Sequence, residues 1–171
     1  PSSATSGEPA TYFYGSVTSA VAWQDAAPAG GPFPLLVFSH GHQGYAENSS
    51  FLMEHLASHG VLVAAPDHTG NTTFDGSDRT TEIYYQRPRD LSAVLDHLQG
   101  GGEPGLTPSD DPIVALGHSF GGYTVFALAG ADYDLETWSV ACTGGADTSS
   151  FCSTWSEAAE AIFAAGLRDD R

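Results

Sequence analysis

The stretch Ile113-Val-Ala-Leu-Gly-His-Ser-Phe-Gly-Gly-Tyr-Thr-Val-Phe-Ala-Leu-Ala129 decides the fold. It begins with a short apolar run, typical of a strand that is buried in a parallel sheet, and continues as an apolar helix over 120–129. Between them, Gly117-x-Ser119-x-Gly121 predicts a sharp turn in which the glycines let strand and helix pack closely. Such a turn presents the Ser119 hydroxyl at the carboxyl end of the sheet. Ser119 is therefore the candidate nucleophile.

The rest of the chain alternates short apolar runs with amphipathic segments. We expect strands at 11–14 and 17–23, buried strands at 35–39, 61–65 and 113–116, and helices from Ser49 or Ser50 to Gly60, over 89–98 and over 154–165. Because strands and helices alternate, the sequence predicts an α/β class with a mostly parallel sheet and helices on both faces.

A second loop falls where an acyl-transfer site would need it. His40-Gly41-His42-Gln43 follows the strand expected at 35–39. Backbone N–H groups in such a loop can stabilise the oxyanion of a tetrahedral intermediate. We expect one donor to be the N–H of Phe120, directly after the nucleophile, and the other to be the N–H of His42, with Gln43 as second choice.

Four segments together resemble a known family. They are Phe38-Ser-His-Gly41, Leu56-Ala-Ser-His-Gly-Val61, Ala64-Ala-Pro-Asp-His68 and Gly117-His-Ser-Phe-Gly-Gly122. They are similar to the plasma and type II platelet-activating-factor acetylhydrolases and their bacterial relatives, which are often labelled predicted dienelactone hydrolases. The resemblance covers roughly 33–131.

The resemblance implies the α/β-hydrolase fold and a calcium-independent serine esterase, a carboxylic ester hydrolase without metal or organic cofactor. By the same resemblance Ser119 is the nucleophile, and the backbones of His42 and Phe120 form the oxyanion hole. True dienelactone hydrolases use a cysteine nucleophile, whereas this chain has serine. The predicted mechanism is attack of Ser119 on an ester carbonyl, followed by hydrolysis of the acyl-enzyme.

The activating base is missing from its usual place. Members of this fold place the triad in the order serine, acid, histidine, but the last histidine here is His118. A chain ending here would also leave the 113–116 strand as a bare apolar edge. We therefore interpret 1–171 as the N-terminal part of a single α/β-hydrolase domain. A second polypeptide from the same processed precursor would complete the sheet and supply the acid and the histidine, giving a heterodimer.

Three other interpretations remain open at this point. An upstream histidine could serve as a substitute base. The protein could be a peptidase or amidase on the same fold. Because the base is absent, it could also be a non-catalytic hydrolase-fold module that only binds ligands.

The candidate pocket residues neighbour the two loops. Tyr45 and Phe120 adjoin the proposed oxyanion donors, and His40, His118 and Trp138 complete the set. Trp138 belongs to a long loop over 131–155, which we expect near the active site.

The same loop contains both cysteines, Cys142 and Cys152. At this spacing they can form a disulfide, with two free thiols as the alternative. A disulfide implies an oxidising compartment and thus a secreted or periplasmic protein.

The charge balance is strongly acidic. The chain has 5 basic and 21 acidic residues and a formal net charge of -16. This balance argues against nucleic-acid binding and against docking on anionic membranes, since both require basic surfaces. No apolar run reaches the length of a transmembrane helix. Asp75 and Asp78 are a weak calcium candidate, because their spacing matches no complete calcium loop.

Overall fold

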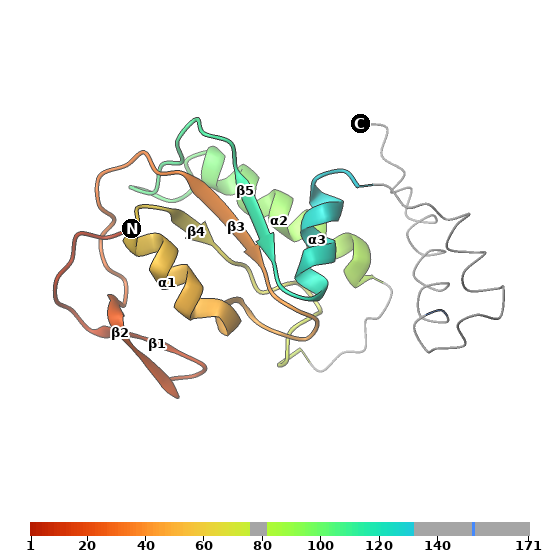
Figure 1. The fold of residues 1–171 in the computed structure, drawn as a ribbon, viewed down its shortest axis with the longest axis horizontal. Coiled ribbons are helices and arrows are strands. Elements are labelled where there is room, and N and C mark those ends of the chain that lie inside the picture. Colours follow the sequence, from red (N-terminus) through yellow and green to blue (C-terminus); the bar gives the residue numbers. More distant parts are fainter. Residues whose placement is uncertain (76–81, 132–151, 153–171) are drawn as a thin grey trace.

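The structure is a computed structural model that describes residues 1–75, 82–131 and 152. Figure 1 shows its arrangement. The elements are, in chain order, β1 (Pro9–Tyr12), β2 (Val17–Trp23), β3 (Leu35–Ser39), the 3-10 helix η1 (Ala46–Ser49), α1 (Ser50–Ser58), β4 (Leu62–Ala64), α2 (Ile83–Gln99), β5 (Val114–Gly117) and α3 (Phe120–Leu128).

A parallel sheet of order β4-β3-β5 lies at the centre of the fold. Every residue of β3 is buried, as its unbroken run of apolar side chains predicts. Ser39, the last residue of β3, pairs with Gly117, the last residue of β5. The loop after β3 and the turn after β5 therefore leave the sheet side by side, at the carboxyl ends of the two strands.

Helices cover both faces of this sheet, as predicted. In Figure 1, α1 lies in front of the sheet and α2 behind it, and α3 packs against both α2 and the sheet. The core beneath α2 is a cluster of Phe33, Leu35, Leu62 and Leu98. A separate antiparallel hairpin, β1-β2, lies beside α1.

Helix α2 begins at Ile83, six residues before the expected start at Arg89, and continues through Pro88. Proline has no N–H and leaves the carbonyl four residues earlier without its usual helical partner. That carbonyl belongs to Tyr84, and the Tyr123 hydroxyl of α3 donates a hydrogen bond to it at 2.9 Å. The expected boundary was wrong because a long-range contact compensates the proline.

Three other expectations need correction. Strand β1 ends at Tyr12 rather than Tyr14, because Phe13 and Tyr14 adopt positive φ angles of 54° and 55° and form the hairpin turn. The apolar residues of α1 predict a buried helix face that includes Phe51, but the Phe51 side chain is 76% exposed. The strand of 113–116 is not buried, since Val114 is 54% exposed and β5 forms an edge of the described sheet.

Several predictions fall on residues outside the described ranges. They include the helix over 154–165, Trp138, and the 131–155 loop apart from its first residue and Cys152. Cys152 takes part in a disulfide bond, but Cys142 is outside the described residues, so the pairing stays a prediction. Asp78 also lies outside them, and the described residues contain no cluster suited to a metal ion. None of the described helices is long and apolar enough to cross a membrane.

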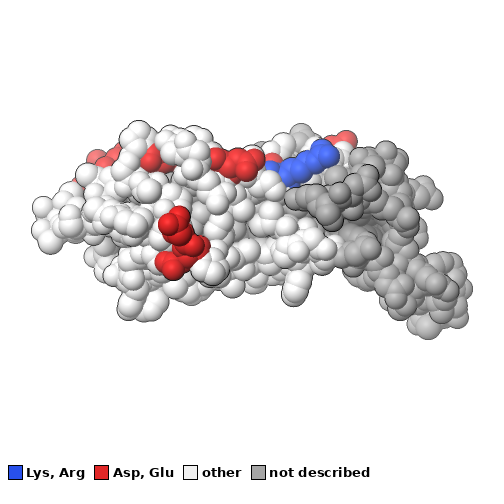
Figure 2. Space-filling view, turned by 90° about the horizontal axis from the view of Figure 1, so that it is seen from above, with Lys and Arg blue, Asp and Glu red and all other residues white. Residues whose placement is uncertain are grey.

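The surface reflects the acidic composition. Figure 2 shows carboxylate side chains scattered over the upper face, with basic atoms gathered at one place. Arg87, one of the five basic residues, is absent from the surface because it is fully buried.

Candidate active site

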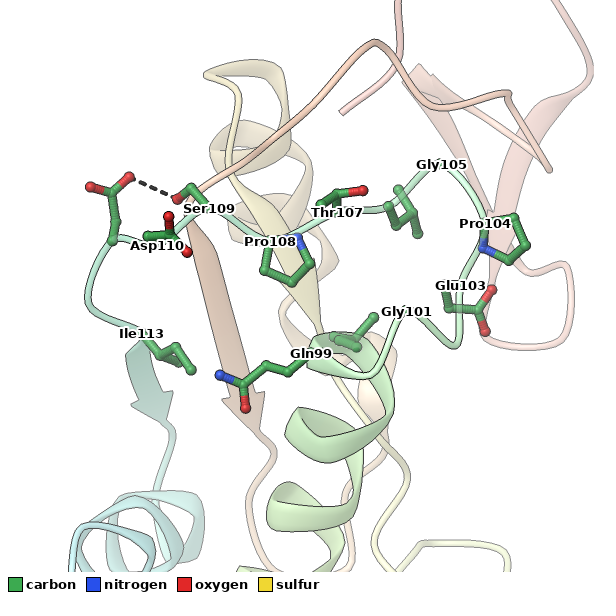
Figure 3. A pocket seen from close by; sticks show the side chains of 13 residues that line it. Gln99, Gly101, Glu103, Pro104, Gly105, Thr107, Pro108, Ser109, Asp110 and Ile113 are labelled. Carbon is green, nitrogen blue, oxygen red and sulfur yellow. Dashed lines mark hydrogen bonds between the residues drawn. The ribbon is translucent and has the colours of Figure 1, made fainter.

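One pocket of about 540 Å³ lies at the amino end of β5. Its walls come from the end of α2 and from the loop that leads to β5, including Gln99, Pro108 and Ile113 (Figure 3). Ser119 follows the opposite end of β5. Because ligands of parallel α/β sheets bind at the carboxyl ends of the strands, we place the candidate site at that end of the sheet.

Ser119 occupies the strained turn that its sequence pattern predicts. Its φ and ψ angles are 54° and -121°, a conformation that non-glycine residues rarely adopt. A Cβ added at Gly117 would collide with the backbone of Gly121, and one added at Gly121 would collide with the carbonyl of Ser39. The two glycines therefore let the strand, the turn and α3 approach one another around an exposed serine.

The 40–43 loop lies against this turn. The His118 N–H donates to the Ser39 carbonyl at 3.1 Å, and a Cβ placed on Gly41 would stand 3.4 Å from the Ser119 Cβ. The His42 ring makes an edge contact with the Phe120 ring at 6.0 Å. Within the described part of the chain, no acceptor is bonded to the N–H of His42 or Phe120. Both predicted oxyanion donors are thus close to Ser119 and available.

We expected His40 to be a pocket residue, but it lies beneath the loop. It is fully buried. Its Nδ1–H donates to the Gly41 carbonyl at 2.7 Å, and its Nε2 accepts the His68 N–H at 3.1 Å. These two bonds define a neutral ring, and burial lowers the pKa of His40 to about 4. His40 therefore supports the loop from below.

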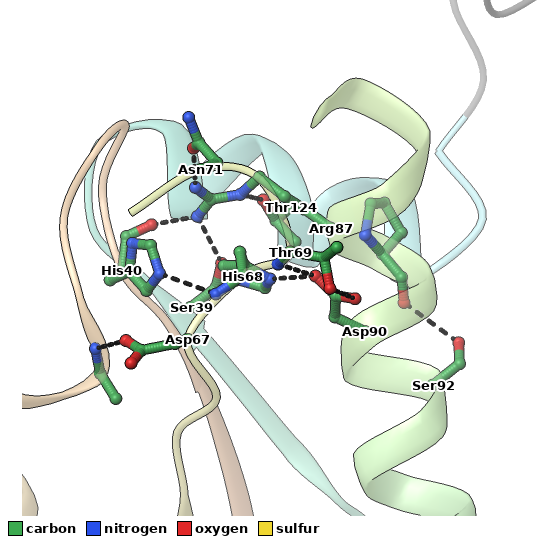
Figure 4. A network of polar contacts seen from close by, with 12 residues as sticks. Ser39, His40, Asp67, His68, Thr69, Asn71, Arg87, Asp90, Ser92 and Thr124 are labelled. Carbon is green, nitrogen blue, oxygen red and sulfur yellow. Dashed lines mark hydrogen bonds and ion pairs between the residues drawn. The ribbon is translucent and has the colours of Figure 1, made fainter. Parts of the chain in front are cut away.

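His68 is also buried and forms part of a Ser-His-Asp chain that the sequence did not indicate (Figure 4). Its Nε2 lies 2.8 Å from Ser39 Oγ, and its Nδ1 lies 3.0 Å from Asp90 Oδ2. Burial lowers the pKa of His68, although its bond to Asp90 opposes the shift. Ser39 is completely buried, so this chain of hydrogen bonds offers no accessible nucleophile.

Arg87 joins these groups into one network. Its guanidinium donates to Ser39 Oγ at 3.0 Å, to Asn71 Oδ1 at 2.5 Å and to the carbonyl of His40. It also donates to Thr124 Oγ1 at 3.0 Å and, more weakly, to the Gly41 carbonyl at 3.4 Å. Figure 4 shows these groups converging between β3 and α2.

The sequence holds one signal of this network, which the predictions above did not use. Ile83, Arg87 and Leu91 follow one another at intervals of four residues, and all three are buried. An arginine on the apolar stripe of a helix is unusual in a chain with so few basic residues. Asn71 and Asp90 carried no comparable signal, because only the folded chain brings them to Arg87 and His68.

No histidine of this chain is placed as a base for Ser119 by a hydrogen bond. All seven histidines are among the described residues, and none is hydrogen-bonded to Ser119. His118 is exposed next to Gly41, and His55, His59 and His97 are exposed elsewhere. His68 is buried and is hydrogen-bonded to Ser39 and Asp90. The geometry therefore gives no support to a substitute base.

Tyr45 belongs to an aromatic group beside the loop. Its ring lies 5.0 Å from that of Phe13 and 5.6 Å from that of Phe74, and the Phe74 ring contacts Tyr14 at 4.7 Å. Tyr14 and Phe74 are 83% and 54% exposed. An apolar surface from three separate segments thus adjoins the 40–45 loop.

Comparison with known proteins supports the predicted resemblance. The canine platelet-activating factor acetylhydrolase is 36% identical over 84 residues, which are 49% of this chain and 17% of that protein. Chlorophyllase-2 of Arabidopsis thaliana is 34% identical over 102 residues, 58% of this chain and 30% of that protein. Cutinase est1 of Thermobifida alba is 32% identical over 106 residues, 61% of this chain and 33% of that protein.

A solved structure agrees with these relatives. The ferulic acid esterase from Streptomyces cinnamoneus superposes with a TM-score of 0.56 at 32% identity, covering 65% of this chain and 36% of that chain. The chain thus spans about a third or less of the relatives named here. The model of the family described as chlorophyllase matches residues 24–144. Since this match includes well over half of the sequence, the chain belongs to the chlorophyllase family and has the α/β-hydrolase fold.

Proposed function

We propose that this chain provides the nucleophile and the oxyanion hole of a serine carboxylic ester hydrolase. The observation that supports this most directly is the strained, exposed Ser119 beside two backbone N–H groups without acceptors, those of His42 and Phe120. Relatives named acetylhydrolase, cutinase and ferulic acid esterase agree with ester substrates.

In this mechanism Ser119 Oγ attacks the ester carbonyl and its proton passes to a base. The N–H groups of His42 and Phe120 stabilise the oxyanion of the tetrahedral intermediate. Collapse of the intermediate expels the alcohol and leaves an acyl group on Ser119, which water then removes. Tyr45, Phe120 and His118 would border the substrate, with Trp138 as a further candidate.

We also propose that the histidine and the acid come from polypeptide outside these 171 residues, in a second chain from the same precursor. Two observations support this. None of the seven histidines is bonded to Ser119, and β5 presents exposed Val114 at the edge of the described sheet. Further strands beside β5 would cover this edge and could position the missing groups.

The bond at Cys152 supports an extracytoplasmic location, either secreted or periplasmic. Disulfides persist in oxidising compartments and are rare in the cytosol. Detection of the native protein outside the cytoplasm by fractionation would test this proposal, and its confinement to the cytosol would contradict it.

Labelling with a fluorophosphonate tests the nucleophile. The purified protein, with any polypeptide that accompanies it, should be labelled on the peptide that contains Ser119 and should hydrolyse p-nitrophenyl acetate. Ser119→Ala should abolish both, while Ser58→Ala, a change at an exposed serine of α1, should alter neither. A label on the peptide that contains Ser39, or no label on a complete protein, would contradict the proposal. The second outcome would favour a binding module.

The partner is tested by native and denaturing intact mass. We expect a second polypeptide in the native complex, and Val114→Arg should release it. Val21→Arg places the same charge on a valine of β2 that is 68% exposed, against 54% for Val114, and should leave the complex intact. A monodisperse 171-residue chain that is active alone would refute this part of the proposal.

A further inference from the structure

Arg87 of α2 is fully buried in a chain with a net charge of -16. Its hydrogen-bond acceptors in the described part of the chain are all uncharged oxygens. Burial lowers the pKa of Arg87 to about 10, so the side chain is protonated at neutral pH. A buried charge is expensive, and a well-packed apolar residue often stabilises a fold more. Stability alone is therefore a weak reason for an arginine here.

The first group of contacts lies on the peptide that carries one oxyanion donor. The Gly41 carbonyl and the His42 N–H are opposite ends of a single planar peptide, so fixing the carbonyl fixes the direction of the N–H. That carbonyl accepts bonds from His40 Nδ1–H at 2.7 Å, from Gly44 N–H at 3.1 Å and from Arg87 Nη1 at 3.4 Å. Donors at the carbonyl also polarise the peptide and strengthen its N–H as a donor.

Arg87 reaches the same loop by two other routes. It donates to the carbonyl of His40, one residue earlier. It also donates to Asn71 Oδ1, and the Asn71 side-chain amide lies 3.1 Å from Nδ1 of His42. Both the backbone and the side chain of His42 are thereby connected to one guanidinium group.

The second group of contacts lies on the segment of the other donor. The guanidinium carbon stands 5.0 Å from the centre of the Phe120 ring. Nε donates to Thr124 Oγ1, and the Thr124 hydroxyl donates to the Phe120 carbonyl at 3.1 Å. Arg87 therefore bridges the start of α3 and the loop after β3.

We infer that Arg87 is a positioning residue that sets the spacing and direction of the His42 and Phe120 N–H groups around the oxyanion. This inference rests on the proposed function. Arginine suits the task because its planar group has five donors in a fixed arrangement, whereas lysine places a single point charge. Arg87 does not contact the substrate in this scheme and acts through the two backbone segments.

The test compares Arg87→Lys and Arg87→Met with the unmodified protein in its complete form, including any accompanying polypeptide. We expect kcat for p-nitrophenyl acetate to fall about 10- to 100-fold in both, with KM changed less than about 3-fold, since the oxyanion forms after substrate binds. The affinity for a trifluoromethyl ketone, whose adduct mimics the oxyanion, should fall in parallel with kcat. An unchanged kcat, or a loss confined to KM, would overturn the inference.

Two variants on the same helix provide controls. Arg89→Met removes an exposed arginine and should leave kcat unchanged. Leu91→Ala truncates another fully buried side chain of α2, one that has no polar group to offer the loop, so it should lower the free energy of unfolding but not kcat. If Leu91→Ala lowers kcat as much as Arg87→Met at equal loss of stability, Arg87 is merely structural.

If neither Arg87 variant folds, a less disruptive substitution tests the inference. Thr124→Val removes the acceptor of Nε and keeps the arginine, and it should lower kcat several-fold; an unchanged kcat overturns the inference. The activity of the unmodified protein distinguishes a failure of the proposed function from a failure of this inference. If it neither reacts with fluorophosphonate nor hydrolyses the ester, the proposed function fails and this inference with it. If it is active and the Arg87 variants are equally active, only this inference fails.

Discussion

At the scale of single residues, the shape of the site depends on two positions that have no side chain. The turn at Ser119 is possible because Gly117 and Gly121 have no side chains where strand, turn and helix meet. Gly122, the next residue of α3, has open space around its Cβ position. Two adjacent glycines therefore differ sharply in what they contribute.

This difference leads to a paired prediction. Gly121→Ala should lower the free energy of unfolding by about 3 kcal/mol or more, because the added Cβ overlaps the Ser39 carbonyl at the end of β3. Gly122→Ala should raise it by about 0.5–1 kcal/mol, since alanine is the better helix former. Urea unfolding of both variants measures the contrast, and equal effects would contradict the collision argument.

The free energy of unfolding should also depend on pH, because a buried histidine is neutral in the folded chain. Burial lowers the pKa of His40 from 6.5 to about 4, so between these values the unfolded chain binds a proton that the folded chain does not. Stability is complete above pH 6.5 and is lost as pH falls, by about 3 kcal/mol at pH 4. His68, whose pKa is also lowered, contributes in the same direction. Urea unfolding at several pH values should show this decline.

The variant His40→Asn keeps a donor for the Gly41 carbonyl but does not titrate, so its decline between pH 7 and pH 4 should be shallower. His97→Asn, at an exposed histidine of α2, should retain the full decline. If all three proteins lose stability equally with falling pH, His40 is not the source.

At the scale of elements, α2 links the core to the site. Its apolar face packs Leu98 into the core beneath the sheet, and its first turns hold Arg87 beneath the oxyanion loop. Those first turns persist although Pro88 interrupts the helical hydrogen bonds, because the Tyr123 hydroxyl donates to the Tyr84 carbonyl.

A double-mutant cycle tests this compensation. Tyr123→Phe should cost about 1 kcal/mol of unfolding free energy when Pro88 is present, because the Tyr84 carbonyl loses its donor. In a Pro88→Ala background the new N–H of residue 88 can reach the same carbonyl, so the cost should be smaller. Chemical unfolding of the four proteins gives the coupling energy, and strictly additive effects would contradict the compensation.

At the scale of the whole molecule, charge is the dominant property. A net charge of -16 with one of five arginines buried leaves a surface in which like charges repel. Such repulsion acts on the folded chain more than on the expanded unfolded chain, and salt screens it.

We therefore expect the melting temperature at pH 7 to rise by several degrees between about 10 mM and 0.5 M NaCl, as the screening length falls from about 30 Å to a few ångströms. Thermal unfolding monitored by circular dichroism measures the change. Near the isoelectric point of about 4.3 the same increase in salt should have little effect. A salt effect of equal size at both pH values would exclude charge repulsion as its cause.

The sequence by itself determined the parallel α/β core, the turn at Ser119 and the loop that faces it. These features depend on local patterns: an apolar run, paired glycines, and a loop directly after a strand. Their positions then follow from the rule that parallel strands end at one edge.

Only the tertiary structure decided which residues lie beneath the loops at the carboxyl ends of the strands. It showed that α2 continues through Pro88 and that His40 supports the loop from below. It also brought Arg87 and Asn71 to the same loop. The physical reason is that a buried polar group is defined by its partners, and these partners are distant in sequence and meet only when the chain has folded.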